Sequence, residues 1–79
     1  MARVLMFGRL ADVAGWRERS IAAASLVALT AALSAEDPAL GEALAAPGVK
    51  VAVDQALVSG DVPLADGSEV AFLPPMSGG

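Results

Sequence analysis

The sequence predicts an α+β fold in which one mixed sheet of four to five strands packs against one main helix. Segments with strand-like and helix-like patterns follow one another in the order strand, strand, helix, strand, short strand, strand. The first and last of these segments are the most uniformly apolar, so we expect them to be neighbours at the centre of the sheet. With 79 residues, the chain is expected to form one domain over 1–79, with a flexible C-terminal segment at 76–79.

The N-terminal part predicts a hairpin. Residues 3–9 (RVLMFGR) are apolar and predict a strand that is buried on both faces. Residues 10–15 (LADVAG) predict a turn or a single helical turn that is closed by glycine. Residues 16–22 (WRERSIA) alternate between apolar and charged side chains, which indicates an edge strand beside the first.

The main helix is predicted to follow Ser25, whose hydroxyl can cap a helix N-terminus. Leu26, Leu29 and Leu33 recur at helical spacing and predict the stripe that faces the core. Residues 36–38 (EDP) break this pattern, and residues 39–45 predict a second short helix.

The C-terminal part predicts further strands. Residues 49–54 (VKVAVD) alternate cleanly and indicate a strand with Val51 in the core. Residues 55–58 (QALV) indicate a short strand or a strand turn. Residues 59–69 are rich in turn formers, and residues 69–73 predict the last strand. We expect Asp12, Glu18, Asp61 and Glu69 to be solvated.

Composition excludes several classes of function. The net charge is −4 and the five basic residues form no run, which argues against a nucleic-acid partner. There is no cysteine or histidine, so the commonest catalytic bases and metal ligands are missing and no metal site is expected. The longest apolar stretch, residues 21–33, is shorter than the roughly 20 residues of a membrane span, so no membrane association and a cytoplasmic location are expected.

The ending EVAFLPPMSGG places a proline pair, Pro74 and Pro75, directly after an apolar strand. Proline fixes φ and ends the strand. The four residues that follow the pair can project at most about 13–14 Å when fully extended. Glycine has no Cβ, and a Gly78–Gly79 terminus can enter a narrow channel in a partner enzyme. Activating its carboxylate requires adenylation, yet the chain has no phosphate-binding motif, so a separate activating enzyme is implied. Terminal disorder without function is the alternative interpretation.

Two stretches carry a resemblance to a known family. Residues 56–79 (ALVSGDVPLADGSEVAFLPPMSGG) resemble the C-terminal half of the small subunits of molybdopterin synthase, which are ubiquitin-like sulfur carriers of molybdenum-cofactor synthesis. Residues 4–15 (VLMFGRLADVAG) resemble their N-terminal strand and turn, whereas residues 16–48 match in pattern only. The most specific feature is the LPPMSGG ending combined with L-x-D-G-x-E-V.

The resemblance implies the β-grasp fold and a mechanism. An adenylating (E1-like) activating enzyme would use ATP to activate Gly79, and a sulfur donor would convert it to a thiocarboxylate. Gly78 would let the segment enter the large synthase subunit, where the sulfur passes to cyclic pyranopterin monophosphate. The large subunit would supply the catalytic groups, so this chain would bind no cofactor and would not be an enzyme by itself. The family also suggests a heterotetramer.

The family docks on its partners through an exposed apolar patch. We expect that role, or else a place in the core, for the apolar residues near the root of the segment, and we assign partner binding to Phe7, Leu57, Leu73, Pro74, Pro75, Met76 and Ser77. Three other functions stay open: a sulfur carrier of the thiamine or another pathway, a ubiquitin-like modifier that forms an amide with a target lysine, and a plain interaction module.

Overall fold

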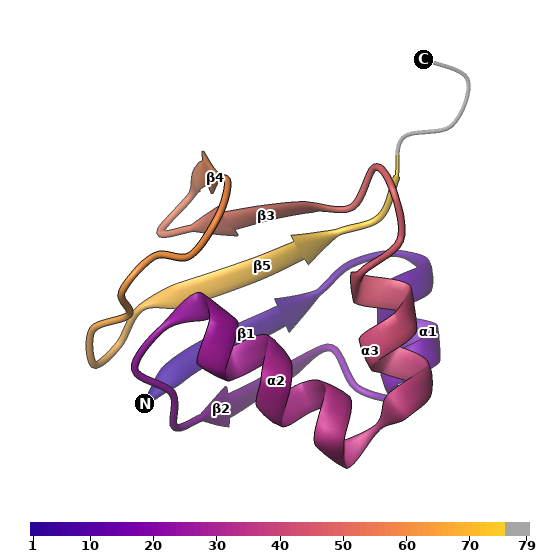
Figure 1. The fold of residues 1–79 in the computed structure, drawn as a ribbon, viewed down its shortest axis with the longest axis horizontal. Helices are drawn as coiled ribbons and strands as arrows, with labels where there is room; N and C mark the ends of the chain where they lie inside the picture. Colours follow the sequence, from indigo (N-terminus) through magenta and orange to yellow (C-terminus); the bar gives the residue numbers. More distant parts are fainter. Residues whose placement is uncertain (76–79) are drawn as a thin grey trace.

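The computed structural model describes residues 1–75 of the chain. Within these 75 residues, five strands form one sheet and three helices lie beside it (Figure 1). The elements in chain order are β1 (Ala2–Met6), α1 (Arg9–Ala14), β2 (Glu18–Ile21), α2 (Leu26–Glu36), α3 (Pro38–Leu44), β3 (Lys50–Val53), β4 (Ala56–Val58) and β5 (Glu69–Leu73). The predicted α+β class, the mixed sheet and the main helix are therefore confirmed.

The first and last strands are neighbours in the middle of the sheet, as predicted. The strand order is β2-β1-β5-β3-β4, and β1 and β5 run parallel with Val4 opposite Val70. The other three pairs are antiparallel, which makes the sheet mixed. Because β5 joins β1 to β3, the chain leaves the sheet from its central strand.

The prediction that the first strand is buried on both faces is wrong. Along β1 the side chains of Ala2, Val4 and Met6 are buried, whereas Arg3 is exposed and Leu5 is half-buried. This is the period of two of a strand that has one face in the core and one toward solvent. The uniformly apolar letters VLMF conceal the alternation, because the outward-facing positions also carry apolar side chains.

The helices begin and end at the residues that the sequence favours. The Ser25 hydroxyl accepts a hydrogen bond from the Ala28 backbone N–H at 3.1 Å and caps α2. The helical turn α1 ends at Gly15, which adopts the left-handed conformation with φ +83°. Helix α3 carries proline at its first position, where the missing N–H costs nothing.

Three of the four acidic residues that we expected to be solvated make defined contacts. The carboxylate of Asp61 accepts a hydrogen bond from the Val27 backbone N–H at 2.8 Å, so a remote loop supplies a second cap to α2. Glu18 and Glu69 both pair with Arg3. These contacts join segments far apart in the chain, which composition does not reveal.

The core lies between the sheet and the helices. The fully buried side chains of Leu29, Leu33 and Leu40 come from α2 and α3 and meet Val70 and Phe72 of β5. The predicted stripe of Leu26, Leu29 and Leu33 is thus confirmed, while Val51 is half-buried at the margin of this cluster. All three helices contribute to this face of the sheet, so the opposite face is left open.

Candidate functional site on the open sheet face

The open face of the sheet carries a row of apolar side chains that crosses four strands. The register places Leu5 of β1 beside Ala71 of β5, Ala71 beside Ala52 of β3, and Ala52 beside Leu57 of β4. Directly opposed residues point to the same face of a sheet, so these four share the face away from the helices. Ala71 lies outside the core cluster but is only 8% exposed, Leu5 and Ala52 are half-buried, and Leu57 is 68% exposed.

Phe7 and Leu73 extend this row toward the end of β5. Phe7 continues the outward positions of β1 and is exposed, and its backbone N–H donates to the Phe72 carbonyl at 3.2 Å. Leu73 is half-buried and pairs with Lys50 across the β3–β5 ladder. We define the open-face patch as Leu5, Phe7, Ala52, Leu57, Ala71 and Leu73.

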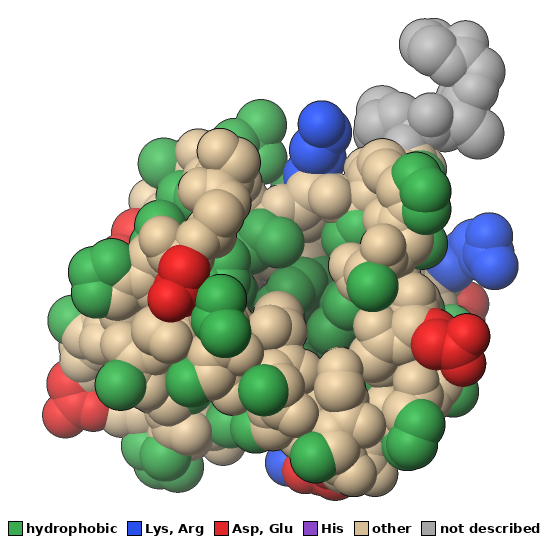
Figure 2. Space-filling model, viewed as in Figure 1, with side chains coloured by type: hydrophobic (Ala, Val, Ile, Leu, Met, Phe, Trp, Pro, Cys, Tyr) green, Lys and Arg blue, Asp and Glu red, His purple; other side chains and the backbone are tan. Residues whose placement is uncertain are grey.

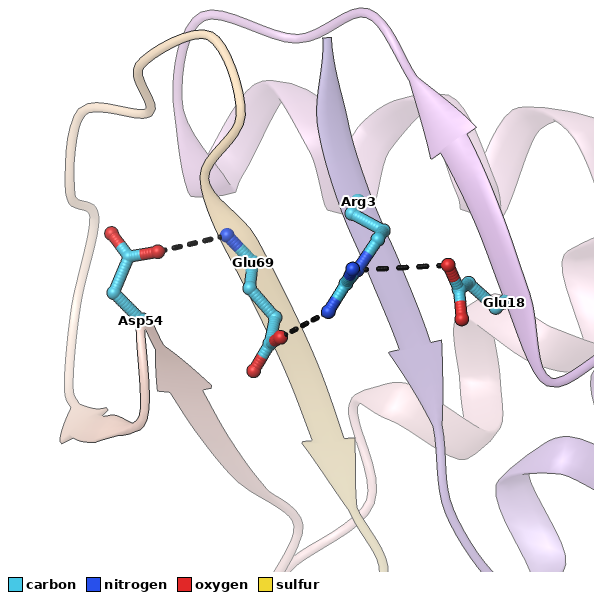
Figure 3. Close-up of polar contacts among 4 residues, drawn as sticks. All are labelled: Arg3, Glu18, Asp54 and Glu69. Atoms are coloured by element: carbon cyan, nitrogen blue, oxygen red, sulfur yellow. Dashed lines mark hydrogen bonds and ion pairs between the residues drawn. The ribbon is translucent and has the colours of Figure 1, made fainter.

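A charged cluster borders the open-face patch on the side away from the end of β5. The Arg3 guanidinium lies 2.5 Å from a Glu69 carboxylate oxygen and 3.6 Å from a Glu18 carboxylate oxygen (Figure 3). The Asp54 carboxylate accepts a hydrogen bond from the Glu69 backbone N–H at 3.0 Å. Exposed ion pairs of this kind contribute little to stability. Their side chains form the polar border of the open-face patch.

The proline pair leaves the sheet at the opposite border of the patch. Pro74 is half-buried and Pro75 is exposed. Both line a small cavity of about 100 Å³ between α1 and α3, together with Arg9, Leu10, Val13, Ala43 and Ala46. The chain is therefore supported by side chains for two residues beyond its last strand.

Basic side chains border the end of β5. Arg9 lines the cavity beneath the proline pair, and Lys50 lies opposite Leu73. Neither forms an ion pair with another residue of the described range 1–75. Figure 2 shows basic side chains at this end of the molecule, whereas acidic ones are distributed around its periphery.

The groups with shifted pKa values lie elsewhere. A hydrogen bond from Arg19 lowers the pKa of Glu36, and one from the N-terminal ammonium group lowers the pKa of Asp66. Within residues 1–75 no cluster of three His, Cys, Asp or Glu side chains could hold a metal ion, and no helix is long and apolar enough to cross a membrane.

Five of the assigned partner-binding residues fall within the described range. Phe7, Leu73 and the proline pair lie close to the end of β5, while Leu57 lies on the edge strand β4, two strands away. The remaining assignments, Met76, Ser77, Gly78 and Gly79, lie outside the described residues. Sequence reasoning missed Leu5, Ala52 and Ala71, which the cross-strand register places in the patch.

Comparisons with known proteins agree with this geometry. A family model described as the ThiS family matches residues 4–79. The molybdopterin synthase sulfur carrier subunit of Escherichia coli (strain K12) is 38% identical over 81 residues, an alignment that covers all of both proteins.

Solved structures share the whole fold. SAMP1 from Haloferax volcanii is 26% identical with a TM-score of 0.83, and the match covers 99% of this chain and 98% of the SAMP1 chain. CysO of Mycobacterium tuberculosis, at 24% identity and a TM-score of 0.80, covers 96% of this chain and 100% of its own, and shows the fold alone. These neighbours confirm the ubiquitin-like β-grasp arrangement. Because the family model spans nearly the whole sequence and a curated relative matches it from end to end, the chain belongs to the ThiS family.

Proposed function

We propose that this chain is the sulfur carrier subunit of a molybdopterin synthase. The observation that carries the proposal is the end-to-end match to the E. coli sulfur carrier subunit, combined with a family match that runs to Gly79. The open-face patch supports it, because a carrier without catalytic side chains must dock on enzymes that have them.

The proposed chemistry takes place at the C-terminal carboxylate. The activating enzyme joins the Gly79 carboxylate to AMP from ATP with release of pyrophosphate. A sulfide equivalent from the sulfur donor then attacks the acyl carbon, AMP leaves, and a thiocarboxylate forms. In the large subunit the thiocarboxylate sulfur attacks a carbon of cyclic pyranopterin monophosphate and displaces an oxygen substituent from that carbon, which gives a thioester between the pterin and Gly79. Water then hydrolyses the thioester, so the sulfur stays on the pterin as a thiolate and the Gly79 carboxylate is restored. A second loaded carrier supplies the second sulfur of the dithiolene in the same way.

The absence of cysteine and histidine from the sequence fits this division of labour. The carrier contributes a thiocarboxylate, which is ionised at neutral pH and is a soft nucleophile. Proton transfers and the binding of ATP fall to the partner enzymes. We therefore propose that this chain binds no cofactor of its own.

The test is sulfur transfer in a reconstituted system. The chain is incubated with ATP, the activating enzyme and a sulfur donor, and intact mass is expected to show replacement of one oxygen by sulfur at the C-terminus. Addition of the large subunit and the pterin precursor is then expected to yield the dithiolene. A variant lacking Gly78 and Gly79 is the matched control, and full dithiolene formation by that variant would contradict the proposal.

A second candidate is a protein modifier. It is favoured by the fold match to SAMP1, whose relative in Methanosarcina acetivorans is described as a small archaeal modifier protein. In that role the activated Gly79 would form an amide with a lysine of a target protein. Lysine-linked conjugates in the native cell, without a sulfur-containing form of the chain, would favour the modifier. A carrier for thiamine or another pathway would show the sulfur gain and fail to react with the pterin precursor.

A further inference from the structure

Each proline of the pair packs against the backbone of a glycine from a distant part of the chain. A Cβ atom placed on Gly8 would lie 2.9 Å from Cγ of Pro74, and one placed on Gly48 would lie 3.0 Å from Cβ of Pro75. Favourable carbon–carbon contacts lie at about 3.5–4.0 Å, so at each point there is room only for hydrogen. The two prolines therefore fit this surface because residues 8 and 48 have no side chain.

A proline ring cannot rotate away from such a contact. Its Cβ and Cγ atoms belong to a ring that closes on the backbone nitrogen and fixes φ. A side chain at Gly48 would therefore displace the backbone of Pro75, because Cβ is bonded to Cα, whereas a side chain at Gly8 would shift Cγ of Pro74 by changing the ring pucker. The added carbon at Gly48 would also lie 3.5 Å from Cγ and 3.6 Å from Cα of Pro75. The contact therefore reaches the main chain of Pro75.

The two contacts hold Pro74 and Pro75 against the fold. Leu73 is held in the sheet opposite Lys50, and each of the next two residues is held by one glycine. We propose that Gly8 and Gly48 are positioning residues that set the position and direction in which the chain leaves the fold, and so the placement of Gly79 in partner active sites. This inference rests on the proposed function.

Positioning matters here because the remaining chain is short. Four residues follow Pro75, and fully extended they reach about 13–14 Å. Four residues are too few to compensate for a displaced Pro75 if the Gly79 acyl carbon must reach a fixed reaction site. A misplacement of about 1 Å can lower a rate by roughly 10²-fold.

The fold offers a matched pair of glycines for the test. Gly48 has φ +87° and Gly67 has φ +83°, so alanine suffers similar left-handed strain at both positions. Around Gly67 an added Cβ would meet nothing within 4 Å, whereas at Gly48 it meets Pro75. Gly48→Ala and Gly67→Ala should therefore lose similar thermal stability, and only Gly48→Ala should disturb the proline pair.

The measurement is single-turnover sulfur transfer from the loaded full-length carrier to the pterin precursor in the large subunit. With the large subunit in saturating excess, so that affinity does not limit the reaction, we expect the transfer rate of Gly48→Ala to fall at least about tenfold below that of Gly67→Ala. Equal rates for the two variants would overturn the inference. A change in affinity with an unchanged rate would also overturn it, because Gly48 would then act in docking.

A second variant carries the test if Gly48→Ala does not fold. Pro75→Gly removes the ring from the other side and leaves Gly48 unstrained, so slow transfer at near-normal thermal stability is expected. Where Gly48→Ala does fold, a double-mutant cycle on the transfer rate should show that adding Gly48→Ala to Pro75→Gly slows transfer little further, because its effect passes through Pro75. Transfer by Pro75→Gly at the wild-type rate would contradict the proposal.

Nuclear Overhauser effects in the isolated carrier test the contacts without any partner. Cross-peaks are expected between the α-protons of Gly48 and the Pro75 ring, and between those of Gly8 and the Pro74 ring; their absence would contradict the proposed geometry. Failure of the proposed function is distinguishable. If the wild type acquires no sulfur, that function and any positioning role in transfer fail together. If all variants acquire and transfer sulfur equally, only the positioning role fails.

Discussion

Val4 of β1 lies directly opposite Val70 of β5 in the parallel register, and neither side chain is exposed to solvent. Val70→Ala removes two buried carbon groups at the centre of the sheet, so we expect a loss of about 2 kcal/mol in the free energy of unfolding. For a domain of this size the melting temperature should fall by about 10 °C. Val27→Ala, at an exposed position of α2, is the control and should change the melting temperature little.

Docking should depend on the exposed leucine of the edge strand. Leu57→Asp places a charge in the open-face patch, and we expect the dissociation constant for the large subunit to rise at least about tenfold. Thermal stability should change little, because the Leu57 side chain is largely exposed. Val27→Asp introduces the same charge on α2, on the helical side of the sheet, and should bind normally in titration calorimetry. If both variants raised the dissociation constant for the large subunit equally, the cause would be the change in net charge rather than a docking surface at Leu57.

A small part of the stability that is lost in acid should come from Glu36. Arg19 donates hydrogen bonds to its carboxylate at 2.6 and 3.2 Å and thereby lowers the pKa of Glu36 below its ordinary value of 4.5. A carboxyl group whose pKa is lower in the folded state stabilises the fold above its unfolded pKa, and this contribution is lost as the pH falls through the folded value. Between pH 5 and pH 3 the melting temperature of Glu36→Gln should therefore fall less than that of the wild type. If the melting temperature of Glu36→Gln fell with pH as steeply as that of the wild type, the stabilising role of the Arg19–Glu36 pair would be contradicted. Glu42→Gln is the control.

Asp61 should stabilise the start of α2 from a distance. Its carboxylate accepts the Val27 backbone N–H, so Asp61→Ala should lower the free energy of unfolding by about 1 kcal/mol. Asp61→Asn keeps an acceptor oxygen and should restore most of this stability in chemical denaturation. If both variants were as stable as the wild type, water would replace the cap without cost.

The sequence predicts local structure here better than it predicts faces and remote contacts. The cap at Ser25, the stripe of Leu26, Leu29 and Leu33 and the end of β5 at Pro74 depend on neighbouring residues, and the structure has them where expected. The outward side of Leu5 was missed, because an apolar residue gives the same signal on either face of a strand.

Contacts between remote segments could not be predicted. The packing of Pro74 on Gly8 and of Pro75 on Gly48 follows from how α1, β5 and the loop before β3 come together, and neither glycine stands out in the sequence. Likewise, the membership of Ala52 and Ala71 in the open-face patch follows from strand register. A small side chain gives no sign of its surroundings until its cross-strand neighbours are known.

The central position of β5 also constrains the order in which the molecule can assemble. Without β5, the β1–β2 pair and the β3–β4 pair share no backbone hydrogen bonds. The leucines of α2 would also lack Val70 and Phe72, which belong to the same core cluster. A nascent chain therefore cannot complete the sheet before β5 has been synthesised. We therefore expect folding to finish late in synthesis, and unfinished chains to lack the complete open-face patch.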